Sequence, residues 1–211
     1  VILRDRQQLS DGGMVIVDAG LPHELWTLIL PAAGPPSWIR VPVGGSEFPT
    51  WRTLICAVLD SARDRVLVFG GSQGFASTNE VWSLSLGDEP RWTLIVPQGA
   101  PPARRCQSAA IYDPVRDRMI VYGGAWDAGY EDEVIYADVW SLELSGTPRW
   151  VQLAPLGTLP NKRKGASAVY DPAGDRMLLF GGWAMVPVAY PPSGSTPVVS
   201  DETWSLSLSG V

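Results

Sequence analysis

One pattern that occurs four times in the chain constrains its fold more than any other feature. Four apolar runs each end in glycine, and in the last three the glycine is doubled: they read MVIVDAG, RVLVFGG, RMIVYGG and RMLLFGG. They end at Gly20, Gly71, Gly124 and Gly182, a spacing of about 50 to 60 residues that is typical of repeat architectures. The chain is therefore expected to consist of four copies of one structural unit.

Each unit also places an acidic residue two positions before a tryptophan. The segments read HELWTLIL, NEVWSLSL, ADVWSLEL and DETWSLSL, with tryptophans at Trp26, Trp82, Trp140 and Trp204. A second tryptophan follows in the first three units, at Trp38, Trp92 and Trp150. The repeat thus accounts for seven of the ten tryptophans and leaves Trp51, Trp126 and Trp183.

The local pattern within each unit predicts β-strands. Residues 66–69 are apolar at every position, which a strand tolerates when both of its faces are covered. Residues 81–86 alternate, with Trp82, Leu84 and Leu86 on one face. Aspartate begins the tight turns in LDSARDR, YDPVRDR and YDPAGDR. Because no window shows the 3.6-residue apolar period of a helix, each unit is expected to form four antiparallel strands.

These motifs resemble those of the kelch-repeat family, in the bacterial style in which YDPxxDRM precedes the Gly-Gly pair. The resemblance extends from Met14 to the C-terminus. It implies an all-β, kelch-type β-propeller whose fold is similar to the central domain of galactose oxidase. We expect one propeller region, residues 1–211, with four blades at residues 1–44, 45–98, 99–156 and 157–211.

The fourth unit is expected to lack its outer strand. Trp82 and Trp92 are ten residues apart, as are Trp140 and Trp150, so the equivalent outer tryptophan would fall near position 214, after the last residue. The resemblance implies a propeller of six or seven blades. We therefore expect these blades to be part of a larger ring or to be completed by another chain, which includes self-association through open edges.

Composition excludes several classes of function. The chain has 16 Lys plus Arg against 22 Asp plus Glu, a net charge of −6, which argues against binding to nucleic acids and anionic membranes. No apolar stretch approaches the ~18 residues that span a bilayer. A single histidine rules out most histidine-based metal sites, and we expect no metal and no cofactor. The fold that the resemblance implies is similar to that of galactose oxidase, whose copper centre needs two histidines, and this chain has one. The two cysteines, Cys56 and Cys106, allow at most one disulfide.

Two long loops after the Gly-Gly pair carry candidate binding residues. Residues 125–137 contain Trp126 and Tyr130, and residues 183–200 contain Trp183 and Tyr190. Exposed aromatic side chains on loops are typical anchors for peptides or sugar rings. The alternative is that Trp126 and Trp183 cap the neighbouring blade, because large aromatic side chains are usually mostly buried.

A second candidate site lies on the connections between units. The segments PPARRCQSA and PNKRKGASA match the Arg-x-Gly-His-Ser-Ala segment of the family, with Arg104 and Arg163 at the arginine. In relatives that capture acidic peptides, arginines of this segment make contacts, so the resemblance implies that Arg104, Arg163 and Lys164 bind a partner. The alternative is that these arginines bond to a turn of an adjacent blade.

The acidic residues allow two interpretations. The acid before the repeated tryptophan is Glu24, Glu80, Asp138 or Glu202, and paired carboxylates can act in general acid–base catalysis. A position repeated four times is better explained as a hydrogen-bonding device at the interface between blades. The cluster of residues 131–133 is expected to face solvent, because the spacing of calcium ligands in an EF-hand is absent.

The sequence favours a non-catalytic binding scaffold that presents its loops to a protein or peptide partner. A glycan-binding module that uses the loop aromatics is the first alternative, and a propeller enzyme without a histidine-based metal site is the second. The chain begins at Val1 without the pattern of a signal peptide, so we expect a mature product or an excised segment. The compartment stays open, with a bacterial extracytoplasmic location favoured.

Overall fold

The computed structural model describes residues 2–4, 12–17, 24–31, 33–74, 76–126, 133–188 and 194–209, and side chains are described from Leu25 onward. Every regular element in these residues is a β-strand, as the sequence predicts. None of them forms a helix of the length and apolarity needed to cross a membrane.

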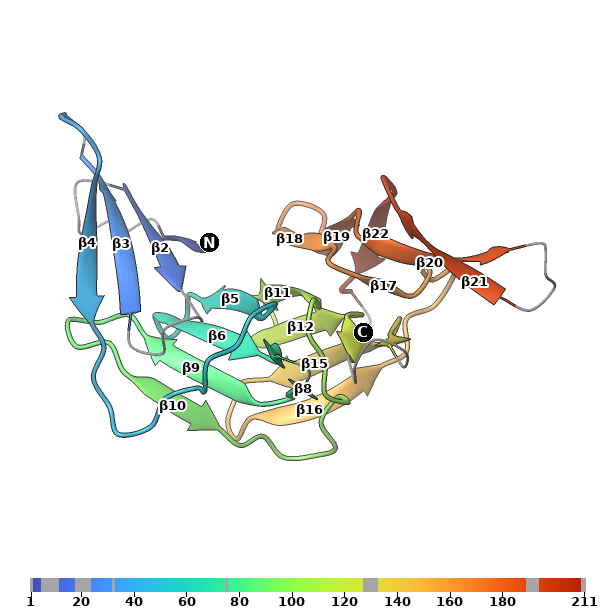
Figure 1. Ribbon diagram of the computed structural model, residues 1–211, viewed down its shortest axis with the longest axis horizontal. Helices are drawn as coiled ribbons and strands as arrows, with labels where there is room; N and C mark the ends of the chain where they lie inside the picture. The colour runs from blue at the N-terminus through green and yellow to red at the C-terminus, as the bar shows by residue number, and fades with distance from the viewer. Residues whose placement is uncertain are drawn as a thin grey trace.

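Four antiparallel sheets follow one another along the chain, and we call them blades 1 to 4 (Figure 1). Blade 1 contains β1 (Ile2–Arg4), β2 (Gly12–Val17), β3 (Glu24–Leu30) and β4 (Ser37–Pro42). Blade 2 contains β5 (Cys56–Asp60), β6 (Arg65–Phe69), β9 (Val81–Ser85) and β10 (Trp92–Ile95). Blade 3 contains β11 (Ala109–Asp113), β12 (Arg118–Tyr122), β15 (Val139–Glu143) and β16 (Arg149–Leu153). Blade 4 contains β18 (Ser167–Asp171), β19 (Arg176–Phe180) and β22 (Thr203–Ser207).

Blade 4 therefore has three strands where the other blades have four. Within the part of the chain that the structure describes, no strand pairs with the outer edge of β22, which confirms the missing outer strand predicted from the sequence. The blades form an open arc: the inner strands β5, β11 and β18 lie side by side, and the sheets do not close into a ring (Figure 1).

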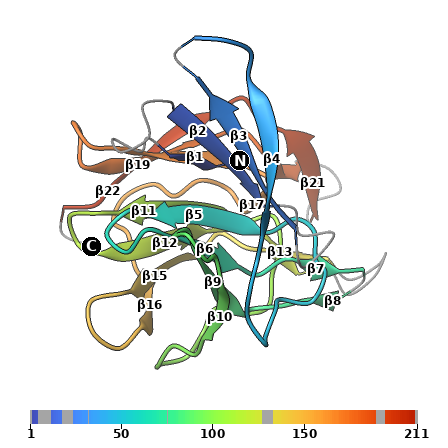
Figure 2. The ribbon, with the colours of Figure 1, turned by 90° about the vertical axis from the view of Figure 1, so that its left-hand side faces the viewer.

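Short side sheets extend three of the blades beyond the Gly-Gly turns. They are formed by β7 (Ser72–Gln73) with β8 (Ala76–Ser77), by β13 (Ala125–Trp126) with β14 (Val134–Ile135), and by β17 (Arg163–Lys164), β20 (Trp183–Val188) and β21 (Gly194–Val199). Figure 2 shows β7, β8, β13 and β21 on the same side of the molecule. We call this side the hairpin end.

The core lies between the blades. Leu67 and Phe69 of blade 2 pack with Met119, Val121 and Trp150 of blade 3 in one cluster. A second cluster joins blade 1 to the opposite face of blade 2, and a third joins blade 3 to blade 4. The all-apolar runs of blades 2 and 3 are thus buried on both faces, as expected, because each of these two blades is covered by a neighbour on either side.

The outward face of blade 4 has no such cover among the described residues. Val169 and Phe180 are exposed there, whereas the equivalent Ile111 and Tyr122 of blade 3 are buried. The free cysteines Cys56 and Cys106 are both buried, and burial raises the pKa of the Cys56 thiol to about 12.

The aspartates that begin the turns satisfy backbone donors, as their position predicts. The carboxylate of Asp113 accepts hydrogen bonds from the N–H groups of Val115 and Arg116 and from the Arg118 side chain. Asp60 and Asp171 make the equivalent bonds in blades 2 and 4. These bonds fix the turns between the first two strands of each blade.

Candidate interaction surface

A buried arginine, a carboxylate and a tryptophan form the same group in blades 2, 3 and 4. In blade 3 the guanidinium of Arg105 donates to both carboxylate oxygens of Asp138, at 2.6 and 2.9 Å. The indole N–H of Trp140 donates to the same carboxylate at 2.7 Å. The equivalent groups are Arg52, Glu80 and Trp82 in blade 2 and Arg163, Glu202 and Trp204 in blade 4.

The arginines of blades 3 and 4 also join two blades. The side chain of Arg163 donates to the Gly181 carbonyl of its own blade at 3.1 Å. Its backbone bonds to blade 3, where Gly124 donates to the Arg163 carbonyl at 2.9 Å and the Arg163 N–H donates to the Tyr136 carbonyl at 3.1 Å. Arg105 bonds in the same way to Gly71 and Thr78 of blade 2.

The first glycine of the Gly-Gly pair has to be a glycine at this junction in blades 2 and 3. Gly123 has a φ of 61°, and a Cβ at this position would lie 2.6 Å from the carbonyl oxygen of Arg163 in the next blade. Such a contact is far too close for any larger residue. The motif that revealed the repeat therefore marks the place where neighbouring backbones come closest.

The repeated acids of blades 2, 3 and 4 are held as carboxylates by these hydrogen bonds, whereas the side chain of Glu24 lies outside the described residues. Burial works against ionisation of Asp138, but hydrogen bonds from Arg105 and Trp140 lower its pKa below the usual value. Burial also works against ionisation of Glu80, but hydrogen bonds from Trp82 and Arg52 lower its pKa. Hydrogen bonds from Arg163 and Trp204 lower the pKa of Glu202. These contacts agree with the hydrogen-bonding interpretation of the repeated acid. The carboxylate bonds lie within one blade, however, and the backbone of the arginine makes the bonds between blades.

The structure corrects the register of the arginine segment. Sequence comparison placed Arg104 at the position of Arg163, but Arg105 is the residue that makes the equivalent bonds. Arg105 and Arg163 are buried, whereas Arg104 is exposed. The equivalent arginine of blade 2, Arg52, is buried as well. Two positions after each arginine the backbone has a positive φ, at Leu54, Gln107 and Gly165.

Three further candidate residues, Trp126, Trp183 and Lys164, lie at the hairpin end. Trp183 is 48% exposed and Trp126 is 37% exposed, so neither is enclosed by a neighbouring blade. Lys164 pairs with Glu133 across blades 3 and 4. Tyr130, Tyr190, Glu131 and Asp132 fall outside the described residues.

Trp51, which the repeat leaves unassigned together with Trp126 and Trp183, is 55% exposed, and its ring lies beside Gly74 at the turn between β7 and β8. One strand at this end was not expected from the sequence. The loop after Trp183 contains β21, whose residues Val198 and Val199 are exposed. The only signal for β21 was the pair of β-branched residues near the end of a segment rich in proline and serine. The hairpin end thus combines exposed tryptophan and valine side chains with the charged Arg104 and Lys164.

Comparison with known families decides the identity of the fold. Residues 12–205 match the family model described as the KLHDC2/KLHL20/DRC7 Kelch-repeats domain. The chain belongs to the kelch-repeat family. This confirms the resemblance drawn from the Gly-Gly and tryptophan motifs.

One curated relative of this kelch chain is the dynein regulatory complex subunit 7 of Chlamydomonas reinhardtii. The two are 30% identical over 122 residues, which is 57% of this chain and 10% of the relative. The chain therefore spans about a tenth of the length of that relative.

Two solved structures share the propeller fold. The structure of YjhT matches with a TM-score of 0.54 and 15% identity, over 85% of this chain and 51% of the other. A fungal alcohol oxidase of the AA5 family, in complex with copper, matches with a TM-score of 0.59 and 15% identity, over 90% of this chain and 38% of the other. At this identity the likeness shows the fold alone. Among the residues of the kelch chain that the structure describes, no group of three or more His, Cys, Asp and Glu residues could hold a metal ion.

Proposed function

We propose that this kelch chain is a non-catalytic scaffold that binds a protein partner at its hairpin end. The observation that carries the proposal is the exposure of Trp51, Trp126 and Trp183, which lie in or beside the short side sheets of the hairpin end. Tryptophan is enriched among residues that dominate the energy of protein interfaces. Exposed apolar clusters with a polar rim are typical of such interfaces.

The framework behind these side chains supports the proposal. Trp51 directly precedes the buried Arg52, and Trp183 pairs with Lys164 next to the buried Arg163. The arginines are fixed by carboxylate and carbonyl acceptors, so the tryptophan backbones are held in place before a partner binds. Preorganisation of this kind lowers the entropic cost of association.

Among the predicted arginine and lysine contacts, Arg104 and Lys164 suit a partner and Arg163 does not. The guanidinium of Arg163 is buried, and it already donates to Asn161, Gly181 and Glu202. Arg104 is exposed at the hairpin end, and Lys164 is partly exposed with one carboxylate partner. We assign these two cations to the rim of the surface, where they would favour a partner with acidic groups.

The test is affinity capture followed by direct binding. The double variant Trp51→Ala, Trp183→Ala should lose a partner that the wild-type chain captures, and the purified partner should bind the wild type at least about tenfold more tightly than the variant. Val115→Ala is the matched control, because Val115 is an exposed apolar residue on a turn between the first two strands of blade 3.

Retention of every captured protein by the double variant would contradict the proposal. A glycan array on which the wild type binds and the double variant does not would favour the glycan alternative instead. Tightly bound copper or iron together with turnover in an activity screen would favour an enzyme.

A further inference from the structure

The connections that enter blades 2, 3 and 4 share one backbone conformation at the hairpin end, where Thr53 and Cys106 pair with β7 and β13. Two positions after each buried arginine, Leu54, Gln107 and Gly165 have φ values of 57°, 56° and 67°. The Gln107 N–H donates to the Leu54 carbonyl at 2.8 Å, and the Gly165 N–H donates to the Gln107 carbonyl at 2.8 Å. We call these three hydrogen-bonded residues, one from each blade, the connection row.

Leucine is an unfavourable residue for the conformation of Leu54. Positive φ values suit glycine, and a bulky residue with such a φ is an outlier. Among the described residues, the other non-glycine positions with a positive φ are Gln107 and three aspartates, a residue type that tolerates this conformation. The Arg-x-Gly-His-Ser-Ala segment of the family has glycine at this position, and blade 4 keeps it as Gly165. Blade 2 thus holds leucine where glycine would be less strained.

Packing within the chain does not offset the strain at Leu54, because its side chain is 51% exposed. The Gln107 side chain lies toward the following blade, with its Oε1 3.5 Å from the place of a Cβ on Gly165. Leu54 has nearly the same φ and the same hydrogen bond to the following blade, so its Cβ is directed toward blade 3. Strained residues are retained mainly at ligand-binding and catalytic sites, so Leu54 is expected to contact a ligand.

A second repeated position lies directly before each buried arginine. Trp51, Arg104 and Lys162 occupy it in blades 2, 3 and 4, and all three side chains are exposed. The backbone is fixed here, because the Nε of each buried arginine donates to the carbonyl of the residue just before this position. The acceptors are Thr50, Ala103 and Asn161, at 3.0, 2.9 and 3.2 Å. From blade 2 to blade 4 the exposed residue thus changes from aromatic to cationic on an unchanged backbone.

Arg104 and Lys162 differ from most cations of blades 2 to 4, because neither forms an ion pair with a described residue. From Arg52 to Arg176 the chain has thirteen Lys and Arg residues, and ten of them form ion pairs with described carboxylates. The third exception is Arg149, on the outer strand of blade 3. The charges of Arg104 and Lys162 are therefore available to a carboxylate of a ligand.

We propose that the connection row binds an extended segment of a protein partner, with a large apolar residue beside Leu54 and a carboxylate opposite Arg104 or Lys162. Leu54 is then a specificity-determining residue, and the proposal rests on the proposed function because it concerns the same end of the molecule. Neighbouring members of the row are joined by one hydrogen bond, so their Cα atoms are about 5 to 6 Å apart. The row therefore matches about four residues of extended chain.

The first experiment measures the strain at Leu54 without a ligand. Leu54→Gly should raise the melting temperature by about 2 to 4 °C, because glycine adopts the positive φ without a steric penalty. Leu156→Gly is the matched control: Leu156 is 98% exposed and has no positive φ, so its replacement should lower the melting temperature slightly. A melting temperature of Leu54→Gly below that of the wild type would remove the strain on which the proposal depends and overturn it.

The second experiment uses a random heptapeptide library displayed on phage and selected on the immobilised full chain. Enriched peptides should share a large apolar residue with Asp or Glu within four positions of it. A fluorescein-labelled peptide of the consensus sequence should bind Leu54→Gly at least about tenfold more weakly than it binds the wild type or Leu156→Gly. The double variant Arg104→Glu, Lys162→Glu should also bind it at least about tenfold more weakly, and selection on this variant should no longer favour acidic residues.

Enriched peptides without a shared apolar or acidic residue would overturn the proposal, as would a consensus peptide that binds Leu54→Gly as tightly as the wild type. The double variant Trp51→Ala, Trp183→Ala separates this result from failure of the proposed function. Peptides that this variant loses and Leu54→Gly keeps would leave the hairpin end as the binding surface and remove Leu54 from it. Peptides that both variants keep, or no enrichment on the wild type, would contradict both proposals.

Discussion

The guanidinium of Arg63 in blade 2 binds the carboxylate of Asp117 in blade 3 through two hydrogen bonds of 2.7 and 2.5 Å. Arg63 also donates to the Leu144 carbonyl of blade 3. Arg116 repeats the carboxylate contact one blade later, with Asp175. Blade 4 has Gly174 at the equivalent position. Side chains therefore join blades 2, 3 and 4 at the turns between the first two strands of each blade. These turns lie at the other end of the second strand from the Gly-Gly pair.

A double-mutant cycle should detect the Arg63–Asp117 contact. The residues are about one-third and one-quarter exposed, so we expect a coupling energy of about 0.5 to 1 kcal/mol from Arg63→Ala and Asp117→Asn. The measurement is urea denaturation of the wild type, both single variants and the double variant. Arg91 and Glu89, a much more exposed pair, provide the control and should show almost no coupling. Strict additivity at Arg63 and Asp117 would contradict this expectation.

Asp138→Asn should destabilise the chain by about 3 to 5 kcal/mol at neutral pH, because it leaves the buried Arg105 guanidinium without its counter-charge. The substitution keeps the shape of the side chain, so loss of charge and not loss of packing accounts for the effect. Denaturation of both proteins gives the difference. A variant as stable as the wild type would mean that the ion pair contributes nothing to the framework.

Stability should fall on acidification. The folded state lowers the pKa values of Asp117, Asp138 and Glu202 below their usual values of 3.8 for Asp and 4.5 for Glu. Carboxyls of this kind stabilise the fold fully above the unfolded pKa, and the contribution is lost as the pH falls through the lower folded pKa. The melting temperature should therefore be flat near neutrality and decline below about pH 4.5. Asp138→Asn should show a smaller decline; an identical profile would exclude Asp138 from the acid transition.

The two arginines aligned by sequence should behave differently. Arg163→Glu should prevent stable folding of blade 4, because it places a carboxylate against Glu202 in a buried position. Arg104→Glu should leave the melting temperature almost unchanged, because Arg104 is exposed. Thermal melting of both variants makes the comparison, and a strong loss of stability in Arg104→Glu would restore the register derived from sequence.

Trp140→Ala should cost about 3 to 5 kcal/mol of unfolding free energy, the usual range for truncation of a core aromatic residue. Trp140 packs edge-on against Trp150 and donates to Asp138. Trp51→Ala is the matched control and should be nearly neutral, because the Trp51 side chain is half exposed. Similar losses in both variants would mean that Trp51 also supports the core.

The fold could be predicted from the sequence because each blade repeats the same local sequence pattern. Gly123 and Gly70 mark the close approach of neighbouring blades, and Trp82, Trp140 and Trp204 mark the third strand of each blade. The repeat therefore carried the information for the strands, their order and the missing outer strand. These features are periodic and can be read without knowledge of contacts between distant residues.

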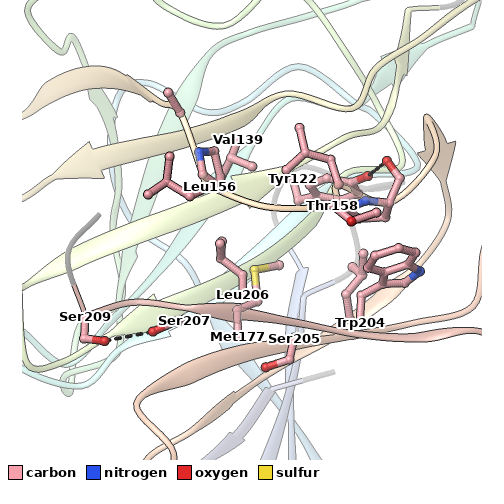
Figure 3. A pocket seen from close by; sticks show the side chains of 15 residues that line it. Tyr122, Val139, Leu156, Thr158, Met177, Trp204, Ser205, Leu206, Ser207 and Ser209 are labelled. Carbon is pink, nitrogen blue, oxygen red and sulfur yellow. Dashed lines mark hydrogen bonds between the residues drawn. The ribbon is translucent and has the colours of Figure 1, made fainter.

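The site could be predicted only in part. Arg104 and Arg105 are adjacent, and the backbone feature that distinguishes the two registers is a positive φ two positions after the buried arginine. Leu54 and Gln107 have this φ, but it cannot be predicted from leucine or glutamine in a sequence. The residues that line the pocket between blade 3 and β22 could not be predicted for another reason: Tyr122 and Leu206 are far apart in the sequence, and both line this pocket because blades 3 and 4 stack (Figure 3).

The contact between an arginine carbonyl and the Gly-Gly turn of the preceding blade uses main-chain atoms alone. Blades 2, 3 and 4 each keep their own guanidinium, carboxylate and indole, and the bonds to the neighbouring blade come from backbone N–H and C=O groups. Duplication, loss or exchange of a whole repeat during evolution would therefore leave this junction chemically unchanged. The number of blades can vary in such a chain without new side-chain partners having to arise at this junction.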